Sequence, residues 1–304
     1  MKIIEKIVNK NLNIDSNTFI FDIETTGLNP KFCKVILIGI LYNCQNKTII
    51  KQFFAESENE EQEILRHFVD EIKCFKKHVT YNGVGFDIGF INYRLKKHNI
   101  YFNLHKEDDF DIFRFIKLFK SPLGLDNCSL STVETYFGIE RDDVIDGSKS
   151  VKLYKEFFKN KDIKVMNTIL LHNYEDIYNL SKLINTKDLV AEKLDLLELD
   201  GINYNLKIFP LSYKINTKKL SINYFIFSGE HNNISIYNDN YSIICQNDNI
   251  SLEININKGI DKDKNTILFY NLSKIIPLKF NDHILNENIY SLCNFIIKNE
   301  LCNI

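Results

Sequence analysis

The sequence lacks the features that mark secreted, disulfide-bonded and membrane-spanning proteins. Its seven cysteines are an odd number, are scattered and include no C-x-x-C pair. This argues against a disulfide framework or a zinc ribbon, and for reduced thiols in a cytosolic protein. No uninterrupted apolar stretch reaches the roughly 18 residues of a membrane span, and the start of the chain shows no signal-peptide pattern. We therefore expect a soluble, cytoplasmic protein.

The chain also lacks a marked excess of either charge. Its formal net charge is -2 at pH 7, which neither supports nor excludes a nucleic-acid partner, because a basic groove can lie on a nearly neutral molecule. A hydrophobic fraction of 44% and a charged fraction of 26% are those of an ordinary globular protein. With 304 residues, the chain can bury a large core and is long enough for two domains.

What the sequence does contain is a pair of acidic residues inside an otherwise apolar strand at residues 18–25. Because side chains two apart on a strand share a face, Asp22 and Glu24 project together while Phe21 and Ile23 face the opposite side. Two carboxylates on one face repel each other unless a cation lies between them or one is protonated. The pattern predicts a metal site on a sheet, and the alternative is a solvated acidic edge strand.

The first two thirds of the chain predict an α/β fold. Apolar patterning indicates three consecutive strands, an antiparallel meander, at residues 18–24, 34–42 and 48–54. A helix should run from Ser57, which forms a capping box with Glu60, to about Lys77. A short strand and further helices follow at residues 78–82, 88–97, 129–137, 150–158 and 162–184. A mixed sheet covered by helices fits this order.

From Gly201 the pattern changes to short alternating strands separated by Asn- and Gly-rich turns. The predicted elements are strands at 221–227, 234–237, 241–245 and 251–256, a further candidate strand at 267–270, and a closing helix at 286–298. Residues 188–199 form either one more helix or a linker. We therefore predict two domains, residues 1–199 and 200–304, the second mostly β. A structural or oligomerisation role and a nucleic-acid-binding role both stay open for the second domain.

Further polar residues stand at positions where they could join Asp22 and Glu24. Asp87 follows a glycine-rich turn and opens a helix, where it could also be a simple N-cap. His172, Asp176 and Asn179 share one face of the helix predicted at 162–184, although this face could equally be a solvated polar stripe. Asp111 we expect to be structural or to support the site.

Three motifs, taken together and in this order, resemble the DEDD 3′→5′ exonucleases of the ribonuclease H-like superfamily, and most closely the YprB-like group of predicted exonucleases. They are Phe21-Asp22-Ile23-Glu24-Thr25-Thr26-Gly27, Tyr81-Asn82-Gly83-Val84-Gly85-Phe86-Asp87 and His172-Asn173-Tyr174-Glu175-Asp176. Two more stretches, Leu125 to Glu134 and Arg141 to Gly147, look like the same group. The resemblance covers roughly residues 15–190. It implies a ribonuclease H-like exonuclease domain at 1–199 and leaves 200–304 as an accessory domain.

The resemblance implies that Asp22, Glu24, Asp87 and Asp176 are the metal ligands. Hard oxygen donors without cysteine suit Mg²⁺ or Mn²⁺ rather than zinc. Two such ions would serve in-line hydrolysis of the phosphodiester bonds of DNA or RNA, starting from a single-stranded 3′ end and releasing 5′-monophosphates. In these exonucleases the base-positioning residue is a tyrosine four residues before the last aspartate or a histidine five residues before it. Here His172 occupies the four-before position, and we expect it to be the general base.

The resemblance also implies contacts to the terminal nucleotide from Thr25, Thr26, Asn82 and Phe86. Phe86 would stack on a base, although it could equally be a core residue. Arg141 is either a phosphate contact or a surface ion pair. Two alternatives stay open for the whole chain: a structure-specific endonuclease on the same fold, and a non-catalytic nucleic-acid-binding or scaffold protein. The retention of four carboxylates argues against the second.

Overall fold

The structure is a computed structural model that describes residues 1–8, 12–142, 147–201 and 205–302. The predicted motif stretch from Arg141 to Gly147 therefore lies partly outside the described residues. The chain divides into two compact units, Met1–Thr186 and Lys187–Ile304. Within the described residues, no helix is both long enough and apolar enough to cross a lipid bilayer.

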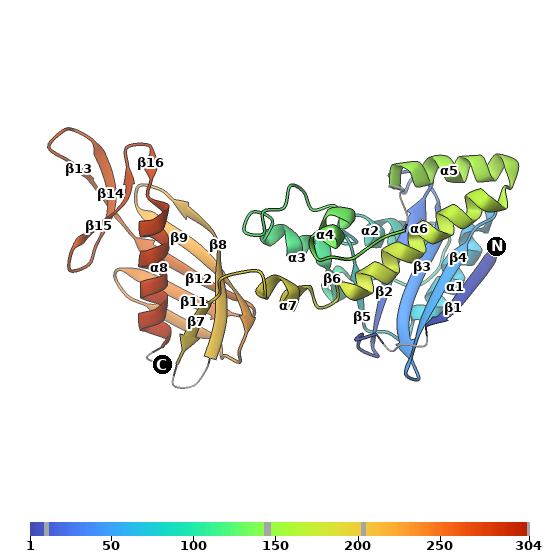
Figure 1. The fold of residues 1–304 in the computed structure, drawn as a ribbon, viewed down its shortest axis with the longest axis horizontal. Helices are drawn as coiled ribbons and strands as arrows, with labels where there is room; N and C mark the ends of the chain where they lie inside the picture. Colours follow the sequence, from blue (N-terminus) through green and yellow to red (C-terminus); the bar gives the residue numbers. More distant parts are fainter. Residues whose placement is uncertain (9–11, 143–146, 202–204, 303–304) are drawn as a thin grey trace. The chain divides into compact units, whose positions relative to one another are not determined.

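A six-stranded mixed sheet forms the centre of the first unit (Figure 1), in the order β1-β4-β3-β2-β5-β6. The pairs from β1 to β2 are antiparallel, whereas β5 pairs parallel with β2 and β6 parallel with β5. The strands are β1 (Lys2–Val8), β2 (Thr18–Thr25), β3 (Val35–Cys44), β4 (Lys47–Phe54), β5 (Lys77–Thr80) and β6 (Asp109–Asp111). The predicted meander is confirmed. Strand β1, which the sequence analysis missed, pairs along β4 at the edge of the sheet.

Helices cover both faces of this sheet. One face packs on α1 and α2, whose apolar residues join Phe19, Phe21 and Ile23 of β2 in one core. The other face packs on α5 and α6, with Ile36 and Phe54 at the contact. The helices of the first unit are α1 (Glu61–Ile72), α2 (Asp87–Lys97), α3 (Ile112–Leu118), α4 (Leu130–Tyr136), α5 (Gly147–Asn160) and α6 (Ile163–Lys182), with 3₁₀ turns at Glu58–Glu60 and Lys106–Asp108. This arrangement confirms the predicted α/β fold, a mixed sheet flanked by helices.

The helix predicted from Ser57 to about Lys77 is shorter than expected. It begins as a 3₁₀ turn, and α1 ends at Ile72. The chain leaves the helix there because the backbone N–H groups of Lys76 and Lys77 donate to the carbonyl of Asn17, at 2.9 and 3.1 Å. These bonds start β5 alongside β2, so sheet pairing ends the helix before its apolar pattern runs out.

The second unit contains two antiparallel sheets and a closing helix, which confirms the predicted mostly-β module. Their orders are β10-β11-β12-β9-β8-β7 and β13-β14-β15-β16. The elements are α7 (Thr186–Ala191), β7 (Leu197–Asp200), β8 (Asn205–Ile215), β9 (Lys219–Ser228), β10 (Ile234–Tyr237), β11 (Tyr241–Gln246), β12 (Asn249–Asn255), β13 (Asn257–Ile260), β14 (Thr266–Asn271), β15 (Ile275–Phe280), β16 (His283–Ile284) and α8 (Asn286–Leu301).

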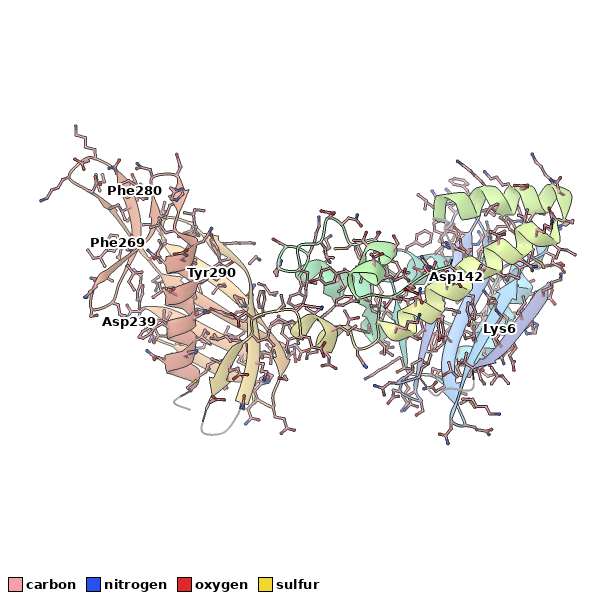
Figure 2. All side chains as sticks on the ribbon, viewed as in Figure 1. Lys6, Asp142, Asp239, Phe269, Phe280 and Tyr290 are labelled. Carbon is pink, nitrogen blue, oxygen red and sulfur yellow. The ribbon has the colours of Figure 1, made fainter. Side chains whose placement is uncertain are left out.

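One apolar core joins both sheets of this unit to α8. Tyr290 of α8 packs against this core, with its ring 5.7 Å from that of Tyr213 on β8, whereas Phe280 at the end of β15 is exposed (Figure 2). The segment 188–199, predicted as a helix or a linker, contains the end of a short helix and a loop, but its last residues form a strand that was not predicted: α7 ends at Ala191, and β7 begins at Leu197. Because β7 pairs with β8, this strand is part of the second unit's sheet.

Candidate metal centre

The acidic pair on β2 faces helix α6. Phe21 and Ile23 pack in the core beneath α1 and α2, and the carboxylate of Asp22 points the other way, where its Oδ2 accepts a hydrogen bond of 3.0 Å from Asn173 of α6. The predicted division of the strand into an apolar and an acidic face is therefore what the structure contains. Its physical origin is the two-residue period of the strand.

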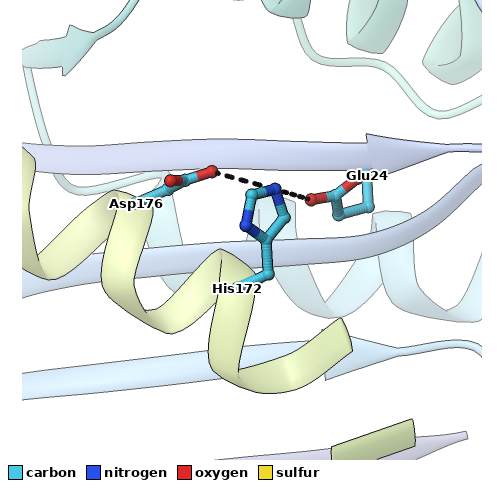
Figure 3. Close-up of side chains that lie close together, drawn as sticks. All are labelled: Glu24, His172 and Asp176. Atoms are coloured by element: carbon cyan, nitrogen blue, oxygen red, sulfur yellow. Dashed lines mark ion pairs between the residues drawn. The ribbon is translucent and has the colours of Figure 1, made fainter. Parts of the chain in front are cut away.

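His172 and Asp176, one turn apart on α6, form a compact group with Glu24 (Figure 3). The Nε2 atom of His172 lies 3.5 Å from Oε1 of Glu24 and 3.6 Å from Oδ2 of Asp176. One potential ligand atom from each of the three residues lies within 4.8 Å of the other two, and all three residues are buried. Two carboxylates and an imidazole at such separations are a donor set that a divalent transition-metal cation accepts.

Asp87 reaches the same region from the start of α2. Its Oδ1 accepts a hydrogen bond of 3.3 Å from the backbone N–H of Ile23, between the two acidic residues of β2. The turn before it depends on Asn82, which adopts the left-handed conformation with φ of 65°. The carboxylate of Asp111 holds this turn by accepting bonds from the N–H groups of Asn82 (2.9 Å) and Val84 (3.2 Å). Asp111 therefore supports the turn that delivers Asp87.

Negative charge is crowded in this region. Burial raises the pKa of Asp22 well above its ordinary value, and the charges of Asp176, Asp87 and Glu24 add to this rise. Burial also raises the pKa of Asp87 to about 7, although hydrogen bonds from two backbone N–H groups oppose the shift. Carboxylates crowded in this way either hold protons or take up a cation. The electrostatics therefore favour cation binding.

Arg141 reaches Asp176 from the other side. Its Nη2 donates to Oδ1 of Asp176, and its Nε lies 3.3 Å from Glu134 and 4.0 Å from Glu175. The side chain of Arg141 is only 14% exposed and that of Glu134 only 1%. The sequence left Arg141 open between a phosphate contact and a surface ion pair. The structure places it in a largely buried ion-pair network.

A pocket of about 630 Å³ opens over these groups, within the range typical of ligand sites. Its lining residues are Asp22, Ile23, Glu24, Thr25, Gly27, Leu28, Phe86, Ser129, Leu130, Ser131, Arg141, Val151, His172 and Asp176. Of the predicted nucleotide contacts, Thr25 and Phe86 line this pocket, whereas Thr26 and Asn82 are not among its lining residues, and neither is Asp87. The backbone N–H of Thr26 already donates to the carbonyl of Lys34, at 2.9 Å.

Two residues of this group carried no signal that marked them in the sequence. Asn173 stands within the third motif, but helical spacing places it about 100° from His172 around α6. Its contact with Asp22 becomes visible only once α6 packs on β2. Glu134 ends the resembling stretch Leu125 to Glu134, and its burial beside Arg141 depends on how the short helix α4 meets the loop that follows it.

Comparison with known proteins gives partial matches to much longer proteins. The DNA polymerase III PolC-type of Ureaplasma parvum serovar 3 is 40% identical over 108 residues, which cover 28% of this chain and 8% of the polymerase. The chain thus spans a small fraction of that relative's length.

Two solved structures are similar to this chain at a low level. The family B DNA polymerase from the hyperthermophilic archaeon Pyrobaculum calidifontis has a TM-score of 0.45 and 19% identity, over 55% of this chain and 24% of that chain. E. coli exonuclease I in complex with a dT13 oligonucleotide has a TM-score of 0.33 and 14% identity, over 67% of this chain and 54% of that chain.

A family match covers the first unit. The sequence profile of the RNase_H superfamily matches residues 19–187, which is more than half of the 304 residues. The matched region begins in β2 and ends in α7, so it includes every residue of the candidate metal centre. By this match, and with the mixed sheet and helices described above, the chain belongs to the RNase_H superfamily.

Proposed function

We propose that the first unit is a metal-dependent 3′→5′ exonuclease that acts on DNA or RNA, and that it is a member of the YprB-like group. The observation that carries this proposal is the convergence of Glu24, His172 and Asp176 beside Asp22 in one pocket of an RNase_H superfamily fold. The order of the three motifs along the chain supports the group assignment. We assign the second unit, which contains the predicted residues 200–304 together with strand β7, to an accessory domain.

The donor set fits Mg²⁺ or Mn²⁺. We assign Asp22, Glu24, Asp87 and Asp176 as the ligands, all of them hard oxygen donors, and the pocket's described lining includes no cysteine. Because one oxygen of Asp87 already accepts the N–H of Ile23, its second oxygen is the one assigned to the metal. Two divalent cations bound there would supply Lewis-acid activation of water and neutralisation of the leaving 3′-oxygen.

His172 is our candidate for the general base. A neutral imidazole accepts a proton near neutral pH. The carboxylates of Glu24 and Asp176, 3.5 and 3.6 Å from Nε2, would stabilise the imidazolium that results.

The pocket wall suits the end of a single strand. Phe86 and Leu28 line it, and Leu28 is 84% exposed, so both offer apolar surface on which a terminal base can pack. Thr25 lines the same pocket. Arg141 brings a guanidinium, which matches phosphate geometry, to the same pocket.

The test is a degradation time course with 5′-labelled single-stranded DNA and RNA of equal sequence, run with Mn²⁺, with Mg²⁺ and with EDTA. We expect a descending ladder that requires metal and disappears in Asp176→Ala. The control variant is Glu156→Ala, which removes an exposed carboxylate of α5. No degradation of either strand by wild-type protein that binds Mn²⁺ would contradict the exonuclease assignment.

Circular single-stranded DNA separates the two nuclease alternatives. An exonuclease requires a free 3′ end and leaves the circle intact, whereas an endonuclease cuts it. Linear products from the circle would replace the proposal by the endonuclease alternative. A wild-type protein that binds no divalent cation would instead favour the non-catalytic alternative.

A further inference from the structure

Three residues form a row across the strands beneath α6. Asp22 of β2 lies directly opposite Gly39 of β3, and Gly39 lies directly opposite Gln52 of β4. Residues opposite each other in antiparallel pairs point to the same face of a sheet. All three positions therefore face α6. The row consists of a carboxylate, a position without a side chain, and an amide.

Asn173 of α6 lies over the middle of this row. Its side chain is fully buried. Its Nδ2 donates to the backbone carbonyl of Asp22 at 3.3 Å and to the carboxylate Oδ2 of Asp22 at 3.0 Å, and its Oδ1 accepts from Nε2 of Gln52 at 2.9 Å. A Cβ atom at position 39 would lie 2.1 Å from Oδ1 of Asn173. The glycine therefore makes the space that the amide occupies.

The orientation of both amides is determined by backbone carbonyls at the two ends. Gln52 Nε2 also donates to the carbonyl of Leu170, at 2.8 Å, and Asn173 Nδ2 donates to the carbonyl of Asp22. Carbonyl oxygens only accept hydrogen bonds. Each amide must therefore turn its NH₂ group toward these acceptors. As a result, Asn173 offers an N–H, and not an oxygen, to the carboxylate of Asp22.

We propose that Asn173 is a positioning residue that sets the orientation of the Asp22 carboxylate for divalent-metal binding, with Gln52 fixing the orientation of Asn173. The bond to Oδ2 restricts rotation of the carboxylate and so sets the direction from which Asp22 offers its oxygens. This inference rests on the proposed metal centre. Removing the hydrogen-bond partner of a metal ligand typically lowers metal affinity or activity by about 10- to 100-fold.

The test compares Asn173→Ala with Asn92→Ala. Asn92 of α2 is also an asparagine whose amide is held at both ends, here by the backbone of Leu104: its Nδ2 donates to the carbonyl at 2.8 Å and its Oδ1 accepts from the N–H at 2.9 Å. Both variants remove a hydrogen-bonded amide and should lower the melting temperature. Mn²⁺ affinity, measured by calorimetric titration of the full chain, should fall at least about tenfold in Asn173→Ala only. An Mn²⁺ affinity of Asn173→Ala within twofold of wild type would reduce Asn173 to a structural residue and overturn the inference.

A second variant keeps the test decisive if Asn173→Ala does not fold. Gln52→Leu conserves most of the side-chain volume but removes the donor that orients Asn173. We expect a several-fold loss of Mn²⁺ affinity, smaller than that of Asn173→Ala, because the Asn173 amide can then rotate. An Mn²⁺ affinity equal to that of wild type in this variant would overturn the role of Gln52 in orienting Asn173.

The outcome separates this inference from the proposed function. Wild-type protein that takes up no Mn²⁺ would overturn the metal centre and this inference with it. If wild-type protein takes up Mn²⁺ but degrades no nucleic acid, and affinity still depends on Asn173, the positioning role stands although the exonuclease assignment fails. The readout is metal affinity, so it does not require an active enzyme.

Discussion

The two units bury very different side chains. Among the described residues, all 19 buried polar or charged residues lie between Thr18 and Thr186, in the first unit. The described core of the second unit consists of aliphatic, aromatic and cysteine side chains. Its tyrosine hydroxyl at Tyr224 donates to Asn294 at 2.8 Å. The core of the second unit is thus almost entirely apolar, whereas the first unit buries polar and charged side chains that a purely structural core would exclude.

The difference matters because burying a polar group costs free energy unless it is hydrogen-bonded or paired. The first unit concentrates these groups where β2 meets α6, and there it also crowds carboxylates of like charge. A fold does not need such crowding for stability. This difference is the reason that we place the proposed chemistry in the first unit. Five substitutions test this difference between the units, and the one with the greatest expected effect comes first.

The largest effect should come from Asp22→Asn. We expect the degradation rate to fall at least about 1,000-fold, as for members of a catalytic group that act as a unit. Stability in EDTA should stay equal or rise, because the substitution relieves the repulsion that burial and neighbouring carboxylates create. Rates come from the labelled-strand assay and stability from hydrogen exchange of β2 and α6. If Asp22→Asn were less stable than wild type in EDTA, the assumed repulsion between Asp22 and its neighbouring carboxylates would be contradicted.

Arg94→Leu should destabilise the first unit most. Arg94 and Glu61 form a buried ion pair with side chains 2% exposed, and the variant leaves Glu61 buried without this partner, which costs about 3 to 5 kcal/mol. Burial alone would raise the pKa of Glu61, but bonds from Arg94 and His98 outweigh it and lower the pKa.

The sign of the pH dependence follows from that shift. Because the folded pKa of Glu61 is lowered, its contribution to stability is present above the ordinary carboxyl pKa and is lost as pH falls through the lowered value. Denaturant unfolding at several pH values checks this. The double variant Glu61→Leu, Arg94→Leu should recover part of the stability, since no unpaired charge remains. An equally unstable double variant would show that packing, and not charge, dominates.

Leu292→Ala tests the second unit. Leu292 of α8 is 2% exposed within the apolar core, and its truncation leaves a cavity that should cost about 3 kcal/mol. Peptide-level hydrogen exchange should show the loss in residues 197–301, with Mn²⁺ affinity unchanged. A fall in Mn²⁺ affinity would show that the apolar core of the second unit also affects the proposed metal centre of the first.

Asp109→Asn should stabilise the first unit in a pH-dependent way. Burial raises the pKa of Asp109 to about 7 from its ordinary value of 3.8. A raised carboxyl pKa means that the folded state holds the proton more tightly, so stability falls as pH rises from about 4 to about 7. The variant should therefore match wild type near pH 4 and gain up to about 4 kcal/mol at pH 8.

The neighbouring histidine does not offset this charge. His78 Nε2 lies 3.7 Å from Asp109, and burial lowers the pKa of His78 to about 4, so His78 is neutral across the window in which Asp109 ionises at higher pH. The difference in unfolding free energy between variant and wild type, measured from pH 4 to pH 8, reports the ionisation of Asp109 together with its repulsion from Asp87 and Asp111. A gain that is the same at both ends of the range would refute the assigned pKa shift.

The smallest effect should come from Lys219→Ala in the second unit. Lys219 of β9 pairs with Glu253 of β12, and both side chains are nearly half exposed. Exposed ion pairs contribute little, so we expect a change below about 0.5 kcal/mol that disappears in high salt. Denaturant unfolding at two salt concentrations measures it. A loss comparable to that of Arg94→Leu would show that the second unit also depends on charge pairing.

Local patterns in the sequence predicted those parts of the fold that depend on a short period. The alternation from Phe21 to Glu24 predicted which side chains of β2 face the core, and the four-residue spacing of His172 and Asp176 predicted that they share a helix face. Strand β8 was missed because it contains Pro210 and a shift of register against β9, features that weaken a strand pattern. Strand β1 was missed because most of its residues are exposed.

By itself, the sequence determined the α/β fold, the superfamily motifs and the residue types that a metal centre requires. Only the tertiary structure decided that Asn173 meets Asp22 across the space left by Gly39, a contact between residues 151 positions apart. Likewise it decided that Arg141 meets Asp176. The physical reason is that periodicity specifies which face a side chain occupies, whereas strand register and the packing of α6 on the sheet specify what that face contacts.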